Sequence, residues 1–228
     1  METRTSPPAS ATAVDATPAP PGLREAKKQE TRQLISDHAT RLFIEQGFEN
    51  TTIAEIAAAA RVAKKTVTNY FARKEDLALD HQDEFSATLA RTVASRHPGE
   101  SALAALRRAF EASVAAQDPV AGFAGPEFSR MVADSPTLSA CLRNLHDRRE
   151  QALAEALAEA VGARPDDDDM TVRTVAGLLG AVHRVLFQRI QDLTLAGHTH
   201  DEIAKTVAKE AARSFDLLEP AIHDYAIA

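Results

Sequence analysis

The stretch from Thr51 to Leu77 constrains the fold most, because it contains two short helical patterns separated by a tight turn. Thr52 followed by Glu55 predicts a capping box, in which each side chain bonds the backbone of the other residue. In the second pattern Val67 and Phe71 are four residues apart, so both side chains are expected to face a core. The spacing therefore predicts a helix–turn–helix unit.

Turning Val67 and Phe71 inward leaves a polar outer face on the second helix. The outward positions are Lys64, Lys65, Thr68 and Asn69, with Thr66 and Tyr70 at the edges. Lysine neutralises phosphate, hydroxyl groups bond phosphate oxygens or base edges, and asparagine can pair with adenine. A solvated helix face is the simpler interpretation of any single one of these residues. The whole ordered set, in a helix–turn–helix context, favours a DNA-reading surface.

The net charge of −7 looks unfavourable for a nucleic-acid partner, but its distribution along the chain matters more than its total. Residues 24–80 hold ten Lys or Arg against nine Asp or Glu, whereas residues 81–228 hold fifteen against twenty-two. The acidic excess thus belongs to the later part of the chain, away from the helix–turn–helix.

Residues 1–23 are expected to form a disordered arm, since they are rich in proline and contain almost nothing large and apolar to bury. The basic stretch Arg24 to Lys28 either reaches DNA or simply starts a solvated helix. Apolar periodicity and stop signals then predict helices over 25–46, 101–117, 135–161, 170–196 and 199–218. The stretch 74–97 is predicted to be one long helix that joins the two halves of the chain.

Composition excludes several classes of protein. The single cysteine, Cys141, cannot form an internal disulfide, which favours a reducing, cytoplasmic setting. No signal peptide opens the chain, and the most apolar window, Val175 to Leu186, is interrupted by His183 and Arg184. We therefore expect a soluble protein without a membrane partner.

A set of ordered motifs around the helix–turn–helix resembles the amino-terminal signature of the tetracycline-repressor (TetR) family. The motifs are Gly47-Phe48, Thr51-Thr52-Ile53, Glu55-Ile56-Ala57, Val62, Thr66-Val67, Tyr70-Phe71 and Lys74-Glu75-Asp76-Leu77. The resemblance implies an all-α fold, with a three-helix DNA-binding domain over 24–73 and a larger helical bundle over 74–228 for ligand binding and dimerisation. It also implies that Thr52 and Lys74 hold phosphate and that Lys64 to Tyr70 form the recognition helix.

By this resemblance the chain is a homodimeric repressor that binds a palindromic operator in double-stranded DNA and is released by a small-molecule effector. Two alternatives stay open from sequence, namely a transcriptional activator and a helix–turn–helix module that binds protein without an effector. The chain departs from the family pattern at the turn, where Arg61 replaces a frequent glycine, and at the following cap, where Ala63 replaces a small polar residue. Together with Lys65, Thr68 and Arg73, these departures prevent transfer of an operator sequence from relatives.

Candidate walls of an effector pocket are the larger side chains along the bundle helices. They are Phe85, Leu89, Phe110, Phe128, Met131, Cys141, His146 and Phe187, and each is also compatible with plain core packing. Few polar groups accompany them, which favours an apolar or amphipathic ligand.

The sequence predicts no enzyme and no cofactor, because it contains no nucleophile–base pair, glycine-rich phosphate loop or metal set. Asp166 to Asp169 and the pair His198 and His200 are more typical of helix starts than of metal sites. The helix expected over 170–196 is apolar on more than one face, so a second subunit is expected to cover it, with a central helix of a monomer as the alternative. Gly177, Gly180 and Ala181 would permit a close approach there.

Overall fold

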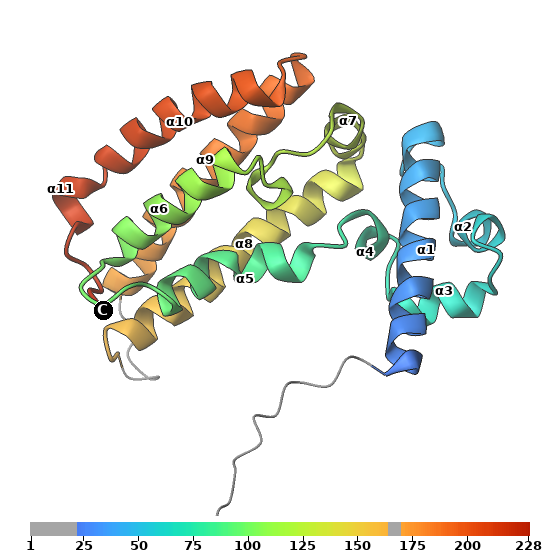
Figure 1. Ribbon diagram of the computed structural model, residues 1–228, viewed down its shortest axis with the longest axis horizontal. Coiled ribbons are helices and arrows are strands. Elements are labelled where there is room, and N and C mark those ends of the chain that lie inside the picture. The colour runs from blue at the N-terminus through green and yellow to red at the C-terminus, as the bar shows by residue number, and fades with distance from the viewer. Residues whose placement is uncertain (1–21, 164–169) are drawn as a thin grey trace, which may run out of the picture.

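The computed structural model describes residues 22–163 and 170–228, and within these ranges the chain contains helices and no strand. The all-α prediction is confirmed. Figure 1 shows a small group of helices around α1 (Leu23–Gln46) at one end of the molecule and a larger bundle at the other. We call the first group, α1 to α4, the head.

The head is built from α1, α2 (Ile53–Ala59), α3 (Lys64–Tyr70) and the short α4 (Glu75–Ala78). Its core is a single apolar cluster whose members include Ile35, Phe43, Phe48, Ile56, Val67, Phe71 and Leu77. Leu77 and Ala78 belong to this cluster, so α4 packs with the head. The domain boundary between residues 73 and 74 stays a prediction.

Local signals in the head act as the sequence predicts. Gly47 ends α1 with φ +85°, a conformation that glycine adopts without strain. Thr52 and Glu55 form the predicted capping box at the start of α2. Arg61 has φ +55° in the turn after α2, which costs a residue other than glycine on the order of 1 kcal/mol. Ala63 occupies the N-cap of α3 and supplies no side-chain hydrogen bond.

The predicted continuous helix over 74–97 is wrong. The chain forms α4, leaves the helical conformation at Leu79 (φ −117°, ψ 57°), and starts α5 (Gln82–Ala94) three residues later. No glycine or proline marks this break. Tertiary contacts cause it, because α4 packs into the head core while Ser36 of α1 donates a hydrogen bond to Asp80 Oδ2 at 3.2 Å. We call residues 79–81 the α4–α5 break.

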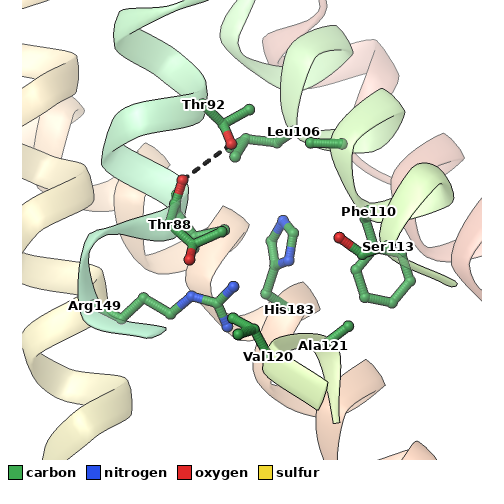
Figure 2. Close-up of a pocket in the computed structure, with 11 residues that line it drawn as sticks. Thr88, Thr92, Leu106, Phe110, Ser113, Val120, Ala121, Arg149 and His183 are labelled. Atoms are coloured by element: carbon green, nitrogen blue, oxygen red, sulfur yellow. Dashed lines mark hydrogen bonds between the residues drawn. The ribbon is translucent and has the colours of Figure 1, made fainter. Parts of the chain in front are cut away.

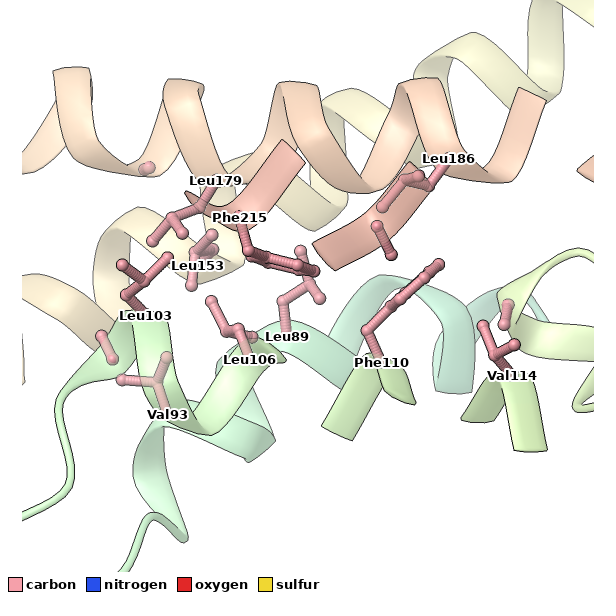
Figure 3. Packing of buried hydrophobic residues seen from close by; sticks show 14 of the residues in the cluster. Leu89, Val93, Leu103, Leu106, Phe110, Val114, Leu153, Leu179, Leu186 and Phe215 are labelled. Carbon is pink, nitrogen blue, oxygen red and sulfur yellow. The ribbon is translucent and has the colours of Figure 1, made fainter. Parts of the chain in front are cut away.

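The bundle contains the remaining helices. They are α5, α6 (Ala102–Ala115), the 3₁₀ turn η1 (Pro119–Ala121), α7 (Pro126–Asp134), α8 (Pro136–Ala160), α9 (Met170–Leu195), α10 (His200–Asp216) and α11 (Glu219–Ile222). α5 packs along α8, and α10 packs on α9 and α6. Figure 3 shows the core between them, where Leu106, Leu153, Leu179 and Phe215 interdigitate. The last helices thus agree with the predicted ranges to within a few residues.

Within the described residues, α9 is long and apolar enough to cross a membrane by length and composition alone. Val175, Leu179, Leu186 and Ile190 are buried in the bundle, however, which identifies α9 as its central helix. For Gly180 the expected close approach of a second subunit needs correction, whereas for Gly177 and Ala181 it stays a prediction. A Cβ atom added at Gly180 would lie 3.0 Å from Glu150 Oε2 of α8, so this glycine makes room for a neighbour within the chain rather than for a second subunit.

The uncapped start of α3 yields a stability prediction. Replacing Ala63 with Ser should supply the missing N-cap bond and raise the free energy of unfolding by about 1 kcal/mol, measured by urea denaturation. The control is Ala58→Ser, at an exposed position inside α2, which should lower the free energy of unfolding by roughly 0.5 kcal/mol. Equal effects of the two substitutions would contradict the assignment of Ala63 to the cap.

Candidate DNA-reading face and bundle cavity

The outer face of α3 carries the polar side chains that the sequence predicts. Val67 and Phe71 are buried, whereas Thr66 and Tyr70 are half-buried at the edges. The exposed positions are Lys64, Lys65, Thr68 and Asn69. The predicted inward and outward positions are therefore confirmed, while the contacts of these side chains with DNA stay a prediction.

Arg32 of α1 fixes the carboxyl end of α3. Its Nη1 donates a hydrogen bond to the carbonyl oxygen of Tyr70 at 3.0 Å, and its guanidinium carbon lies 4.3 Å from the centroid of the Phe71 ring. A cation above an aromatic face is attracted by the ring quadrupole. Sequence reasoning missed this role, because Arg32 looks like any other polar residue of a long amphipathic helix.

Lys74 fixes the turn before α2 from the other side. Its ammonium donates hydrogen bonds to the carbonyl oxygens of Phe48 at 2.8 Å and Thr51 at 3.1 Å, reaches that of Glu49 at 3.5 Å, and lies 4.2 Å from the centre of the Phe48 ring. The predicted phosphate contact of Lys74 stays a prediction, and the ammonium would have to give up one of these bonds to make it. The structure thus adds a bracing role for Lys74.

Thr52 stands at the exposed start of α2. Its hydroxyl donates to Glu55 Oε2 at 2.8 Å and accepts from the Glu55 backbone N–H at 3.3 Å. The hydrogen bonds from the Thr52 hydroxyl and backbone lower the pKa of Glu55. The hydroxyl proton of Thr52 is thus already used within the capping box, and the predicted phosphate contact of Thr52 stays a prediction.

Two kinds of contact join the head to the bundle. Met131 and Val132 of α7 and Leu138 of α8 belong to the apolar cluster of the head, and Leu138 is fully buried there. Next to this cluster, Glu49 Oε1 accepts hydrogen bonds from Ser135 Oγ at 2.6 Å and from the Thr137 backbone N–H at 3.3 Å. The hydrogen bond from Ser135 is the main cause of a lowered pKa of Glu49. The end of α7 and the start of α8 are therefore in direct contact with the head, so a movement of either would change contacts within the head.

A cavity of about 300 Å³ lies where the head meets the bundle. Its walls come from Thr40 of α1, the α4–α5 break, and largely apolar side chains of α5, α7, α8 and α9. The aromatic members of the lining are Phe85, Phe128 and Phe187. An occupant of this cavity would touch the head through Thr40 and the break, and the bundle through the three phenylalanines. We call it the main cavity because of its apolar, aromatic lining, although a more polar cleft beside the turn after α1 has a larger volume of about 520 Å³.

Of the eight predicted pocket residues, the structure brings Phe85, Phe128 and Phe187 together in the main cavity. His146 packs edge-on against the rings of Phe85 and Phe187 at 5.1 and 5.2 Å, and burial lowers its pKa to about 4. The other four lie elsewhere. Leu89 and Phe110 line a small second cavity, Met131 lines a cleft beside the turn after α1, and Cys141 lines a groove near Arg73.

The main cavity also contains residues that sequence reasoning missed, notably Thr40, Leu79 and Gln191. The amide of Gln191 is buried and donates a hydrogen bond to the Gly122 carbonyl oxygen at 2.7 Å. Nothing in the sequence indicated that Leu79 would line a cavity, because it does so only through a helix break that no glycine or proline marks.

Among residues 22–163 and 170–228, no group of three or more His, Cys, Asp or Glu side chains is arranged to hold a metal ion. His198 lies 3.8 Å from Glu202, which also forms a capping box with Thr199 at the start of α10. The acidic run Asp166 to Asp169 falls outside the described residues.

A helix–turn–helix head joined to an all-helical bundle, with an apolar cavity where the two meet, is typical of one class of protein, the transcription regulators. Residues 35–80 match the family model of bacterial regulatory proteins of the tetR family. The chain is 32% identical over 178 residues to the HTH-type transcriptional regulator TcmR of Streptomyces glaucescens, and the match covers 75% of this chain and 77% of that protein. The chain belongs to the TetR family, and it is a transcriptional regulator rather than an enzyme.

Solved structures share the fold. NalD of Pseudomonas aeruginosa, described as the secondary repressor of the MexAB-OprM multidrug efflux pump, aligns with a TM-score of 0.51 at 21% identity, covering 83% of this chain and 97% of NalD. The SmeT–triclosan complex aligns with a TM-score of 0.55 at 18% identity, covering 88% of this chain and 95% of SmeT. At these identities the likeness concerns the arrangement of helices.

The bracing role of Lys74 can be tested by stability. Lys74→Met removes hydrogen bonds from a charged donor to carbonyl oxygens, so the free energy of unfolding should fall by about 1.5–3 kcal/mol, measured by urea denaturation. Lys65→Met, at an exposed position, is the control and should change it by no more than about 0.5 kcal/mol. A Lys74→Met protein as stable as the parent would exclude the brace.

Proposed function

We propose that this chain is a homodimeric, cytoplasmic repressor that binds a palindromic DNA operator through α3 and leaves it when a small molecule occupies the main cavity. The observation that carries the DNA-binding part is the exposed face of α3. Lys64 and Lys65 project from this helix with no ion-pair partner among the described residues, and Asn69 lies on the same outer face. Lysine side chains of this kind neutralise phosphate, and asparagine reads adenine in the major groove.

Dimerisation is supported by apolar surface that the folded chain leaves uncovered on α9. Leu178 and Val185 lie seven residues apart on one face of this helix, and Val185 is 65% exposed. Covering such a stripe with its twofold-related copy is the commonest solution among soluble oligomers. Two heads arranged in this way would meet half-sites whose centres lie about 34–36 Å apart, or a multiple of this distance.

The effector response is supported by the position of the main cavity. Its wall includes the α4–α5 break, and α4 is packed into the core of the head. A ligand that binds better to one arrangement of this break shifts the population toward it, and the affinity for DNA changes by the same coupling free energy. The SmeT–triclosan complex is a structure of the same fold that holds a small molecule. We choose a repressor over an activator because NalD, of the same fold, is described as one.

The DNA-reading face is tested by removing its two adjacent lysines. Lys64→Ala with Lys65→Ala should weaken binding to a fragment from the promoter region of the chain's own gene at least about tenfold, and should lower the salt slope of binding by about 0.9 for each phosphate that is no longer neutralised. Arg91→Ala with Arg143→Ala removes the same charge from exposed bundle positions and should leave the affinity within about twofold. Unchanged affinity of the lysine variant would refute the assignment of α3.

The dimer is tested on α9. The parent chain should elute as a dimer at micromolar concentration in size exclusion with light scattering, and Val185→Glu should convert it to a monomer, since a charge would then lie in the apolar stripe. Ala112→Glu, at an exposed position of α6, is the control and should stay dimeric. A parent chain that is monomeric under these conditions would exclude the proposed arrangement.

A further inference from the structure

A second, much smaller cavity of about 30 Å³ lies inside the bundle, and its lining is more polar than that of the main cavity. Figure 2 shows Arg149 of α8 and His183 of α9 directed into it, with Thr88 and Thr92 of α5 opposite. The hydroxyl of Thr92 is already used, since it donates to the Thr88 carbonyl oxygen at 3.0 Å. The volume is enough for one or two water-sized groups.

Arg149 is a buried cation with an unsatisfied donor among the described residues. It is 6% exposed, and its Nε has no hydrogen-bond partner among the described residues. Burial lowers its pKa only to about 10, so the guanidinium keeps its charge at neutral pH. Asp118 is the acidic group that acts favourably on it, and one oxygen of that carboxylate accepts a hydrogen bond from the Val120 backbone N–H at 2.8 Å. An uncompensated buried charge is strongly disfavoured unless something pairs with it.

Part of the compensation comes from Phe85, whose ring centroid lies 4.5 Å from the guanidinium carbon. A ring face stabilises the charge but cannot accept the hydrogen bond that Nε–H, at the edge of the guanidinium, offers. Arg149 also interrupts an otherwise apolar row on α8, because Leu145, Leu153 and Leu157 occupy the neighbouring positions at intervals of four residues and are buried. A core position that serves packing alone would be apolar here.

His183 lies beside Arg149 and has a second buried nitrogen without a hydrogen-bond partner among the described residues. It is 4% exposed, its ring packs edge-on against Phe110 and Phe215 at 5.5 and 5.7 Å, and its Nε2 has no hydrogen-bond partner among the described residues. Burial first, and then the charge of Arg149, lowers its pKa well below the usual value. The imidazole is therefore neutral at pH 7 and able to donate one hydrogen bond without adding charge.

The two cavities are neighbours. Val120 lines both of them, and Phe85 lines the main cavity while its ring contacts Arg149. The apolar space in which an aromatic molecule would lie is thus separated from the unpaired guanidinium by two side chains.

We propose that Arg149, with His183, binds the anionic group of an otherwise apolar, aromatic effector whose body lies in the main cavity. The side chains of Phe85 and Val120, which separate the two cavities, have to move apart for the anionic group to reach Arg149. This inference rests on the effector part of the proposed function. A carboxylate, phenolate or sulfonate oxygen would pair with the guanidinium and accept a bond from His183, while Phe85, Phe128 and Phe187 enclose the ring system. Binding of the anion supplies the partner that Arg149 lacks in the free protein.

Two fluorescent probes that share one aromatic body separate charge recognition from apolar burial. One is 8-anilino-1-naphthalenesulfonate, and the other is N-phenyl-1-naphthylamine, which lacks the sulfonate. The parent protein should bind the sulfonate at least about tenfold more tightly than the neutral amine. Arg149→Met should abolish this preference while leaving the affinity for the amine within about twofold.

Two further variants complete the test. Arg149→Lys keeps a charge of the same sign and should retain part of the preference, whereas Arg143→Met, an exposed arginine on the same helix, should leave it unchanged. Equal affinity of the parent for both probes, failure of the parent to bind either, or a preference that survives in Arg149→Met would overturn the proposal. A parent ratio near one overturns the proposal whether or not a variant folds, and Arg149→Lys replaces Arg149→Met as the informative variant if the latter fails to fold.

Release of promoter DNA is measured in parallel with the same two probes. If the sulfonate binds tightly through Arg149 but does not release DNA, the anion site is supported and the effector response is refuted. If the sulfonate releases DNA equally well from the parent and from Arg149→Met, the effector response is supported and the anion site is refuted.

Discussion

The structure depends on one apolar core that is shared between the head and the bundle. Leu138 of α8 is fully buried among residues of the head, together with Met131 and Val132 of α7. If the head and the bundle separated, these side chains would be exposed to water. The hydrophobic effect therefore holds the two parts together. The hydrogen bond between Ser135 and Glu49 at the edge of this core fixes the orientation of the head relative to the bundle, since it joins the start of α8 to the turn before α2.

From this shared core the rest of the functional arrangement follows. The head core holds Val67 and Phe71 inward, which turns the polar face of α3 outward, and Arg32 and Lys74 fix the surrounding backbone. On the other side, α4 enters the same core and leaves the α4–α5 break as a wall of the main cavity. The main cavity and the outer face of α3 are therefore joined by a short, continuous path of packed side chains.

Much of the fold could be predicted because its signals are local. The capping box of Thr52 and Glu55, the stop at Gly47 and the four-residue spacing of Val67 and Phe71 each act within one or two helical turns. The α4–α5 break could not be predicted, since it contains no glycine or proline and its cause is packing against α1. The same reason explains the incomplete pocket prediction, because which aromatic side chains meet depends on how distant helices cross. Arg149 did leave a signal, a charged residue in an apolar row of α8, that sequence reasoning overlooked.

The proposed effector response requires that filling the main cavity moves the head. It is tested most directly by pulsed electron resonance on the dimer, with one spin label at Glu45→Cys on the exposed side of α1 and Cys141→Ser to remove the native thiol. We expect saturating 8-anilino-1-naphthalenesulfonate to shift the distribution of distances between the two labels away from that of the DNA-bound protein. If the distribution with the probe bound is the same as that of the DNA-bound protein, filling the cavity does not move the head.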